Sequence, residues 1–440
     1  MDNNYTIHNR DSISKYSSMD TMPEAADYIR NPESFQSFSE GLVELLKSKG
    51  YCGDPCNVAE MTEYLMDKLE KIGSSIKKQT LLSWFSGKNS PKVEASSRPK
   101  MYEICFAMEL TCPETVWFFK QVYYDRAFNC HMIDEAVFYY AFLNGISYPE
   151  AKKIISEIEA APAAAADNNI EPNYTLFVQR RISKFQSSDE LKEFLIANKD
   201  NFKTWNISAS KTLHEMVSLL LGPPQMKEKI DKFKHKLKLT QKKENPNGTV
   251  KDLRQIGKEV YDECGLLMKE ILYDAKYPDK EYGNVWRTPA ESVLELIGNR
   301  NTNSNNFLLE RLLTTSLGMR KNVEIPYIVR NNFPSRKVIS DLLAQEKIST
   351  SKSYDGIRKM IILLDFYCFW LSVKLKIGYT DLTAEELVQT YLEEANHCLY
   401  ECGYEEFYAG NPYDWIFLSS AYSEAPLEYL RSYITELDDE

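Results

Sequence analysis

Glycine and proline are scarce in this chain of 440 residues, which contains 17 of the first and 18 of the second. Both residues interrupt regular structure, so their scarcity favours long helices. Residues 103–119, 251–273 and 385–400 carry apolar side chains at the spacing of one face of an α-helix, whereas no series of alternating strands stands out. We therefore expect a mostly α fold.

The sequence also lacks a long apolar run and an apolar leader. Its longest apolar stretch, residues 360–373, contains Asp365 and is shorter than the ~20 residues that a membrane-spanning helix needs. Nine cysteines without a secretion signal are typical of a protein kept in a reducing compartment. These features predict a cytoplasmic protein with no membrane partner.

Recognisable catalytic and cofactor-binding motifs are absent as well. There is no glycine-rich phosphate loop, no nucleophile elbow and no His-Glu zinc motif, and the five histidines are scattered. Cys52 and Cys56 share their spacing with Cys398 and Cys402, but structural zinc sites favour tighter, repeated pairs with local histidines. Buried free thiols are the better interpretation of these pairs. We expect no enzyme, no cofactor and no metal site.

Charge is distributed unevenly along the chain, whose net charge is −11. Residues 71–100 contain seven basic side chains and one acid, and residues 221–260 contain eleven basic and five acidic ones. Residues 381–440 contain one basic residue, Arg431, against fifteen acids. Nucleic acid would be attracted to the first two segments and repelled by the last, although solvated helix faces also produce such runs.

The first basic segment contains the most informative pattern of the chain. Lys77, Lys78 and Gln79 open a short stretch of helical character, Gly87 ends it, and Pro91 closes the polar turn that follows. A helix with a basic, amide-bearing first turn and apolar residues behind it suits insertion into a DNA groove. The alternative is an ordinary helix whose apolar residues are simply core residues and whose glycine is an ordinary cap.

The stretch resembles the second, recognition helix of Cro/repressor-like helix-turn-helix proteins. The residues that fit the pattern of this family are Thr80, Trp84, Ser86, Gly87, Lys88 and Pro91. The resemblance implies a helix-turn-helix that binds double-stranded DNA, commonly as a homodimer on two half-sites. The side chains that it would present to bases and phosphates are Lys77, Lys78, Gln79, Thr80, Ser83, Lys88 and Lys92.

Polar, proline-containing stretches divide the chain into blocks. Residues 1–35 lack periodicity and predict a flexible N-terminal arm, and residues 161–172, with an alanine run between prolines, predict a linker. Between them, residues 36–160 form the helix-turn-helix domain, in which Thr111 with Glu114 and Ser147 with Glu150 have the form of helix-opening capping boxes. A middle helical domain, residues 173–324, and a C-terminal helical domain, residues 325–440, follow.

The C-terminal block repeats the order of features in the first block. Residues 333–342 align with residues 75–84, and Lys359 aligns with Lys100 at the start of an apolar helix. Aromatic-rich segments 137–142 and 415–418 follow, and then the final helices 149–158 and 426–437. We expect a diverged second copy that kept the fold and lost the groove-reading surface.

Two functions remain open from the sequence. The first is a DNA-binding transcriptional regulator that docks residues 77–80 in the major groove. The second is a helical interaction scaffold without DNA contact, in which the acidic C-terminal block binds a basic protein partner.

Overall fold

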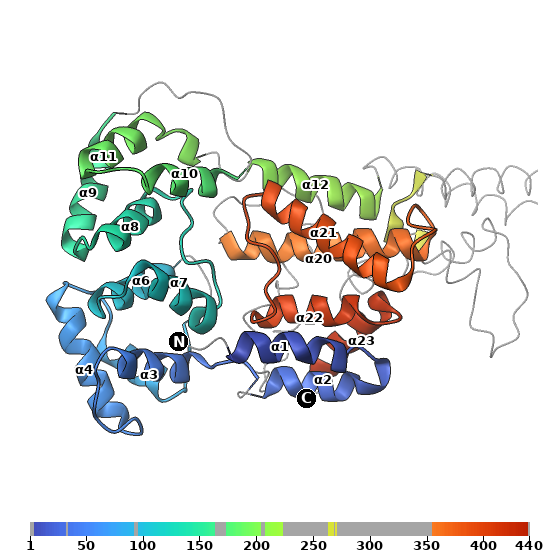
Figure 1. Ribbon diagram of the computed structural model, residues 1–440, viewed down its shortest axis with the longest axis horizontal. Helices are drawn as coiled ribbons and strands as arrows, with labels where there is room; N and C mark the ends of the chain where they lie inside the picture. The colour runs from blue at the N-terminus through green and yellow to red at the C-terminus, as the bar shows by residue number, and fades with distance from the viewer. Residues whose placement is uncertain are drawn as a thin grey trace, which may run out of the picture.

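The computed structural model describes residues 4–31, 34–91, 96–162, 173–203, 207–222, 263–267, 269–270 and 354–438. Every regular element in these ranges is a helix, which confirms the mostly α fold. Figure 1 shows the helices arranged in two halves that lie side by side. The N-terminal half is drawn on the left, and the C-terminal half on the right.

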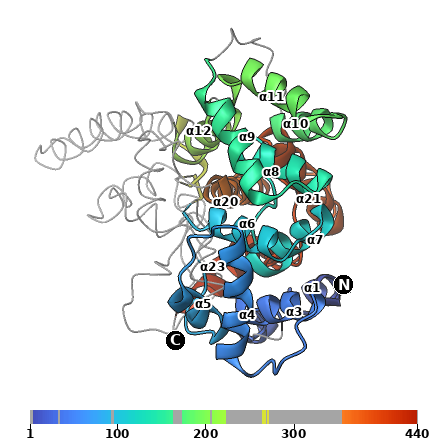
Figure 2. The same cartoon turned by 90° about the vertical axis from the view of Figure 1, so that its left-hand side faces the viewer.

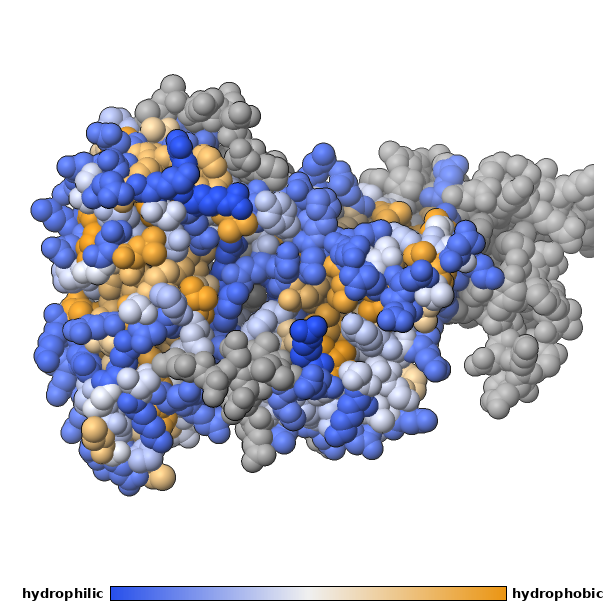
Figure 3. All heavy atoms as spheres, viewed as in Figure 1, coloured by the Kyte–Doolittle hydropathy of each residue, from blue (hydrophilic) through white to orange (hydrophobic). Residues whose placement is uncertain are grey.

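The N-terminal half is formed by a continuous series of helices. They are α3 (Phe38–Ser48), α4 (Val58–Lys71), α5 (Lys78–Phe85), α6 (Arg98–Ala107), α7 (Cys112–Trp117), the π-helical η2 (Phe118–Tyr123), α8 (Ile133–Asn144), α9 (Tyr148–Ala160), α10 (Tyr174–Ile182), α11 (Ser188–Ala197) and the short η3 (Asn201–Lys203). Capping boxes at Thr111 and at Ser147 open α7 and α9, as the sequence predicts. Figure 1 shows α8 to α11 in the upper part of this half and α3 to α7 in the lower part. On the face drawn in Figure 3, hydrophobic residues gather at the surface between these two parts.

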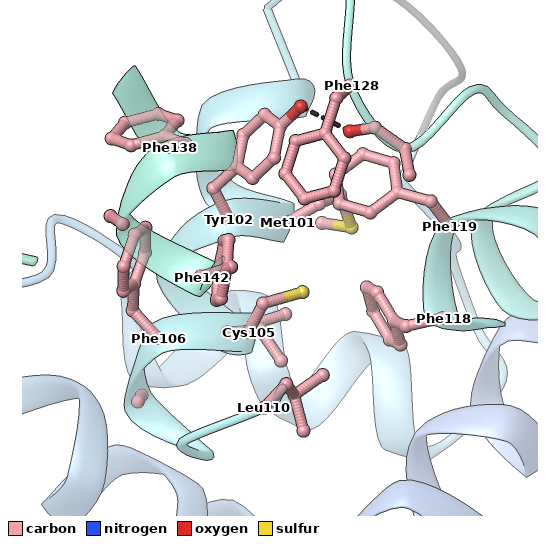
Figure 4. Packing of buried hydrophobic residues seen from close by; sticks show 14 of the residues in the cluster. Met101, Tyr102, Cys105, Phe106, Leu110, Phe118, Phe119, Phe128, Phe138 and Phe142 are labelled. Carbon is pink, nitrogen blue, oxygen red and sulfur yellow. Dashed lines mark hydrogen bonds between the residues drawn. The ribbon is translucent and has the colours of Figure 1, made fainter. Parts of the chain in front are cut away.

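The centre of the N-terminal half is an aromatic core around α6. Figure 4 shows Tyr102 and Phe106 of α6 among the rings of Phe119, Phe138 and Phe142. The Tyr102 hydroxyl donates to the backbone carbonyl of Ala127, so the polar end of this buried ring is satisfied. The core continues without interruption from Phe38 to Phe202.

The continuity of this core corrects the expected domain boundaries. The ring of Tyr174 in α10 stacks on His131, 5.3 Å away, and α11 packs against α9, so residues 173–203 belong to the N-terminal half rather than to a middle domain. Helix α12 (Ile207–Leu221) instead packs along α20 (Tyr354–Lys374) of the other half. The predicted linker lies mostly outside the described residues, as do residues 223–262 and 271–353.

The C-terminal half combines distant parts of the sequence. It contains α12, α20 (Tyr354–Lys374), α21 (Ala384–Glu401), α22 (Pro412–Ala421) and α23 (Pro426–Asp438), together with α1 (Asn4–Lys15), η1 (Met19–Thr21) and α2 (Met22–Arg30). Helix α1 packs against α22, and α2 packs against α23. Figure 1 shows α1 and α2 beside α22 and α23.

The prediction of a flexible arm over residues 1–35 is therefore wrong for the residues that the structure describes. The indole N–H of Trp415 in α22 donates to the carbonyl of Asn9, 3.0 Å away, and lies 2.9 Å from the hydroxyl of Ser12. Tyr28 of α2 stacks on the same indole with ring centroids 5.1 Å apart. Ile29 is fully buried in the core beneath it. The apolar residues of this segment pack against side chains of α22 and α23, about 400 positions further along the chain.

Both halves contain a buried arginine held by the carboxylate of a later helix. Arg98 at the start of α6 contacts Glu135, the third residue of α8, and Arg358 near the start of α20 contacts Asp414, the third residue of α22. The loops that precede α8 and α22 face each other, where the guanidinium of Arg126 donates to the carbonyl of Gly403 across 2.6 Å. The two halves thus meet through corresponding loops.

The sequence alignment of the two blocks is only partly within the described residues. Residues 333–342, the counterpart expected for residues 75–84, lie outside them. Lys359 does not open its helix, because α20 begins at Tyr354. The later segments of each block lie in α8 and α9 on one side and in α22 and α23 on the other, in the expected order.

Candidate nucleic-acid interface

Helices α4 and α5 are joined by a turn of six residues, 72–77. Gly73 adopts a left-handed backbone with φ +73° directly after the last residues of α4, a conformation that favours glycine. The carboxylate of Glu103 in α6 accepts hydrogen bonds from the hydroxyl of Ser74 and, at 3.2 Å, from the backbone N–H of Ser75. The turn is two or three residues longer than the 3–4 that are usual in a helix-turn-helix, and α6 fixes it in place.

The inner face of α5 is anchored in the core of the N-terminal half. Leu81, Trp84 and Phe85 are buried, and Trp84 meets Phe38 of α3 edge to face with ring centroids 5.5 Å apart. The hydroxyl of Ser39 donates to the carbonyl of Phe85 at 2.7 Å and satisfies one of the free carbonyls at the end of the helix. These contacts fix which side of α5 faces solvent.

The outer face of α5 carries the residues that the sequence selects. Lys77, Lys78 and Gln79 are exposed at the start of the helix, and Thr80 is half-buried behind them. Figure 2 shows α5 beside α4 at one end of the N-terminal half, with α9 to α11 toward the opposite end. The basic first turn is therefore exposed, and its one printed side-chain contact with another helix is that of Lys78 with Glu63 of α4.

The end of α5 adds a second cluster of polar groups. Gly87 has φ +67° and turns the chain so that Lys88 is exposed and Asn89 folds back onto the helix. The amide of Asn89 donates to the hydroxyl of Ser83 at 2.8 Å, and its backbone N–H donates to the carbonyl of Ser83 at 3.2 Å. Lys92 lies outside the described residues.

These two clusters border one hollow in the surface. It has a volume of about 580 Å³ and opens to solvent, and its lining includes Gln79, Thr80, Ser83, Lys88 and Asn89. Asn89 was not selected from the sequence, because its role depends on the turn at Gly87 that returns it to Ser83. A glycine followed within two residues by asparagine is a turn signal that points to such a contact.

The charge around α5 is mixed and not uniformly basic. Lys78 forms an ion pair with Glu63 of α4 at 2.9 Å, with 53% and 66% of the two side chains exposed. Three further acids of α4, Glu60, Asp67 and Glu70, are also exposed. Exposed pairs of this kind contribute little to stability, so Lys78 can exchange its carboxylate for another anion.

No known protein family, curated protein or solved structure matches this chain. The resemblance to helix-turn-helix proteins therefore depends on residues 80–91 themselves.

The cysteine pairs differ from the sequence interpretation. Cys52 and Cys56 are exposed rather than buried, whereas Cys402 is buried and Cys398 half-buried. All four are free thiols. Within the described ranges, no group of three or more His, Cys, Asp or Glu side chains is placed to hold a metal ion. In the same ranges, no helix has the length and apolar character needed to cross a membrane.

Proposed function

We propose that this chain is a cytoplasmic transcriptional regulator that binds double-stranded DNA through α5. One observation carries the proposal: the inner face of α5 is locked into the core while its basic, amide-bearing first turn is exposed. A recognition helix needs this division, because packing fixes its angle and its free N-terminal residues contact base edges.

The dimensions and side chains of α5 suit the major groove. Its eight residues extend about 12 Å at 1.5 Å per residue, which is comparable to the width of the groove. Gln79 can pair with the two polar atoms that adenine presents there, and Lys77 and Lys78 with guanine or phosphate. Ser83 supplies a hydroxyl one turn further along, and Lys88 is exposed beyond the end of the helix, where it can reach a phosphate. The sequence also assigns Lys92 to phosphate.

The acids of α4 limit the strength of non-specific binding. Four lysines in this region can neutralise phosphates, so the logarithm of the binding constant should fall with the logarithm of salt concentration with a slope of about −4 or less steep. The proposed interface is therefore small, and two copies bound to two half-sites would supply the affinity of a regulator. We propose a homodimer for this reason.

A duplex selected from a randomised pool provides the test. Fluorescence anisotropy with this duplex would compare the wild type with the double variant Lys77→Glu, Lys78→Glu at about 50 and 200 mM salt. We expect the double variant to lose most of its affinity and to flatten the salt dependence by about two units, because two phosphate contacts disappear.

The matched control places the same charge change on another helix. Lys152 and Lys153 are exposed on α9, away from α5, and Lys152→Glu with Lys153→Glu should leave DNA affinity unchanged. Equal losses in both double variants, or no selectable duplex at low salt, would contradict DNA binding by α5.

We also propose that the two halves are diverged copies of one helical unit. Three features occur in the same order in each half. The N-terminal half has the buried Arg98 in α6, the capping box at Thr111 and the carboxylate of Glu135 in α8. The C-terminal half has Arg358 in α20, the capping box at Thr383 and the carboxylate of Asp414 in α22. The expected counterpart of α5 in the C-terminal half, residues 333–342, lies outside the described residues. We propose that this half serves another role, because its described surface is acidic along α21.

The rival function, a protein-interaction scaffold, is supported by the acidic surface of that half. Exposed acids occur along α21 at Glu385, Glu386, Glu393 and Glu401. A scaffold of this kind would bind no duplex in the selection above, which separates the two functions.

A further inference from the structure

An apolar groove opens on the C-terminal half, between the end of α20, the start of α21 and the connection from α22 to α23. Its volume is about 710 Å³, within the range of ligand-binding clefts. The apolar part of its wall is formed by Trp370, Val373, Leu387, Val388, Tyr422 and Leu427. The groove is distinct from the α5 surface, which belongs to the other half of the molecule.

Two aromatic residues give this groove features of a binding site. Trp370 is 95% buried, as its exposed fraction is 5%, and its indole N–H has no acceptor among the described residues. Tyr422 at the rim leaves 48% of its surface exposed, so its ring is available to an occupant of the groove. Tryptophan and tyrosine are the residues most enriched at the energetic centres of protein interfaces.

The charges around the groove are predominantly acidic. Among the described residues that line it, Glu385, Glu424 and Glu428 are acids and Lys374 is the single base. The ammonium of Lys374 contacts Glu428 at 2.8 Å and Glu270 at 3.3 Å, so its charge is already compensated. Glu385 and Glu424 are exposed and make no ion pair with the described residues. An occupant with lysine or arginine beside apolar residues would match both the wall and the rim.

We propose that this groove binds an amphipathic helix of a partner protein whose apolar face is flanked by basic side chains. Helices dock in such grooves through apolar residues at positions i, i+3, i+4 and i+7. In this mode the apolar residues cover Val373, Leu387 and Val388, and the basic residues meet Glu385 and Glu424. The proposal does not depend on DNA binding, because a scaffold without DNA contact could use the same groove.

A designed peptide tests the proposal on the full-length protein. The probe is a fluorescein-labelled helical peptide of 14 or so residues made only of leucine and lysine in amphipathic order, and its match carries glutamate in place of every lysine. We expect the leucine–lysine peptide to bind at least about tenfold more tightly than the leucine–glutamate peptide, since the rim is acidic.

Two variants and their controls locate the binding. Ala384→Trp fills the groove, and Glu385→Lys with Glu424→Lys reverses its rim; each should weaken the leucine–lysine peptide at least about fivefold. Ala160→Trp at the exposed end of α9, and the double variant Glu159→Lys with Glu193→Lys on α9 and α11, make the same changes elsewhere and should have no effect. Circular dichroism melts confirm that each variant is folded.

Several results would overturn the proposal. One is unchanged peptide binding in Ala384→Trp, which would place the peptide at another surface. Another is equal affinity for the acidic and basic peptides. Self-association that is lost in Ala384→Trp would identify the occupant as a second copy of this chain and not a basic partner. DNA binding through α5 should be unaffected by every groove variant, so failure here and failure of the DNA proposal are separate outcomes.

Discussion

Arg358 donates two hydrogen bonds to the carboxylate of Asp414, each 2.7 Å long. Arg98 makes the corresponding contacts with Glu135 at 2.8 and 2.6 Å. Each arginine also donates to a backbone carbonyl of the loop that precedes the acid's helix, Glu405 or Arg126. Arg98 and Arg358 each link their own helix to the first turn of a later helix and to the loop before that helix.

Electrostatics stabilise the charged form of the buried Arg98. Burial, the largest single influence, lowers the pKa of Arg98, but the carboxylates of Asp125 and Glu135 together outweigh it and hold the pKa well above its ordinary value. Arg98 and its two acids compensate one another, so removing any of them leaves an uncompensated charge in the interior.

The first prediction follows from this compensation. Arg358→Leu leaves the fully buried carboxylate of Asp414 with the backbone N–H of Tyr408 but without its positive partner. It should lower the free energy of unfolding by about 3–5 kcal/mol, as measured by urea titration with circular dichroism. Asp189→Asn removes one partner of the exposed pair with Lys192 and should cost less than about 1 kcal/mol. The double variant Arg358→Leu, Asp414→Leu should recover part of the loss. Similar costs for Arg358→Leu and Asp189→Asn would contradict the role of the buried pair.

The second prediction concerns the N-terminal helices. Ile29 of α2 is fully buried in the C-terminal half, so Ile29→Ala should lower the free energy of unfolding by about 2–5 kcal/mol through lost burial and a residual cavity. The matched control is Ile377→Ala, because 46% of Ile377 is exposed and its truncation leaves little cavity. Urea unfolding followed by circular dichroism measures the free energy of unfolding of both variants. A loss no larger than that of the control would show that α2 does not stabilise this half.

The same region shows where sequence reasoning fails and why. Ala25, Ala26 and Ile29 have helical spacing, but three small or medium apolar residues in a polar stretch are too weak a signal to outweigh its flexible character. Their partners, including Trp415, lie so far along the chain that no local pattern connects them. The burial of Arg98 is equally hidden, since its acids follow 27 and 37 residues later.

The outer and inner faces of α5 could be predicted because both depend on local periodicity. Leu81, Trp84 and Phe85 share one side of a short helix, which leaves the opening lysines on the other. Neither the contact of Asn89 with Ser83 nor the ion pair of Lys78 with Glu63 could be derived in this way. The first needs the left-handed turn at Gly87, and the second needs the angle between α4 and α5.

That ion pair gives the third prediction, which rests on DNA binding by α5. Glu63→Gln removes a negative charge beside the groove-facing turn and frees Lys78 for phosphate, so affinity for the selected duplex should rise about threefold to tenfold at low salt. The gain should shrink as salt rises, because screening weakens the removed repulsion. Fluorescence anisotropy measures both effects. Glu193→Gln on α11 makes the same charge change on another helix, and an equal gain in that variant would rule out a local effect.

The fourth prediction uses the carboxyl of Asp365 in α20. The pKa of Asp365 is raised to about 7, mainly because the carboxyl is buried and also because the charge of Glu394 is nearby. The thiols of Cys368 and Cys398 and the hydroxyl of Tyr379 also face this group and supply no positive charge. An unfolded chain ionises the same carboxyl near pH 3.9.

The direction of the pH dependence follows from these two values. Between about pH 4 and pH 7 the unfolded chain releases a proton that the folded chain retains, so the contribution of Asp365 to stability falls as pH rises and stays low above pH 7. Asp365→Asn cannot ionise and should be more stable than the wild type at pH 8, by up to about 4 kcal/mol for a shift of roughly three pH units, yet similar to it at pH 4. Urea unfolding at both pH values measures the difference. Asp381→Asn, at an exposed position, should change stability little at either pH, and an effect of Asp365→Asn that is the same at both would contradict the raised pKa.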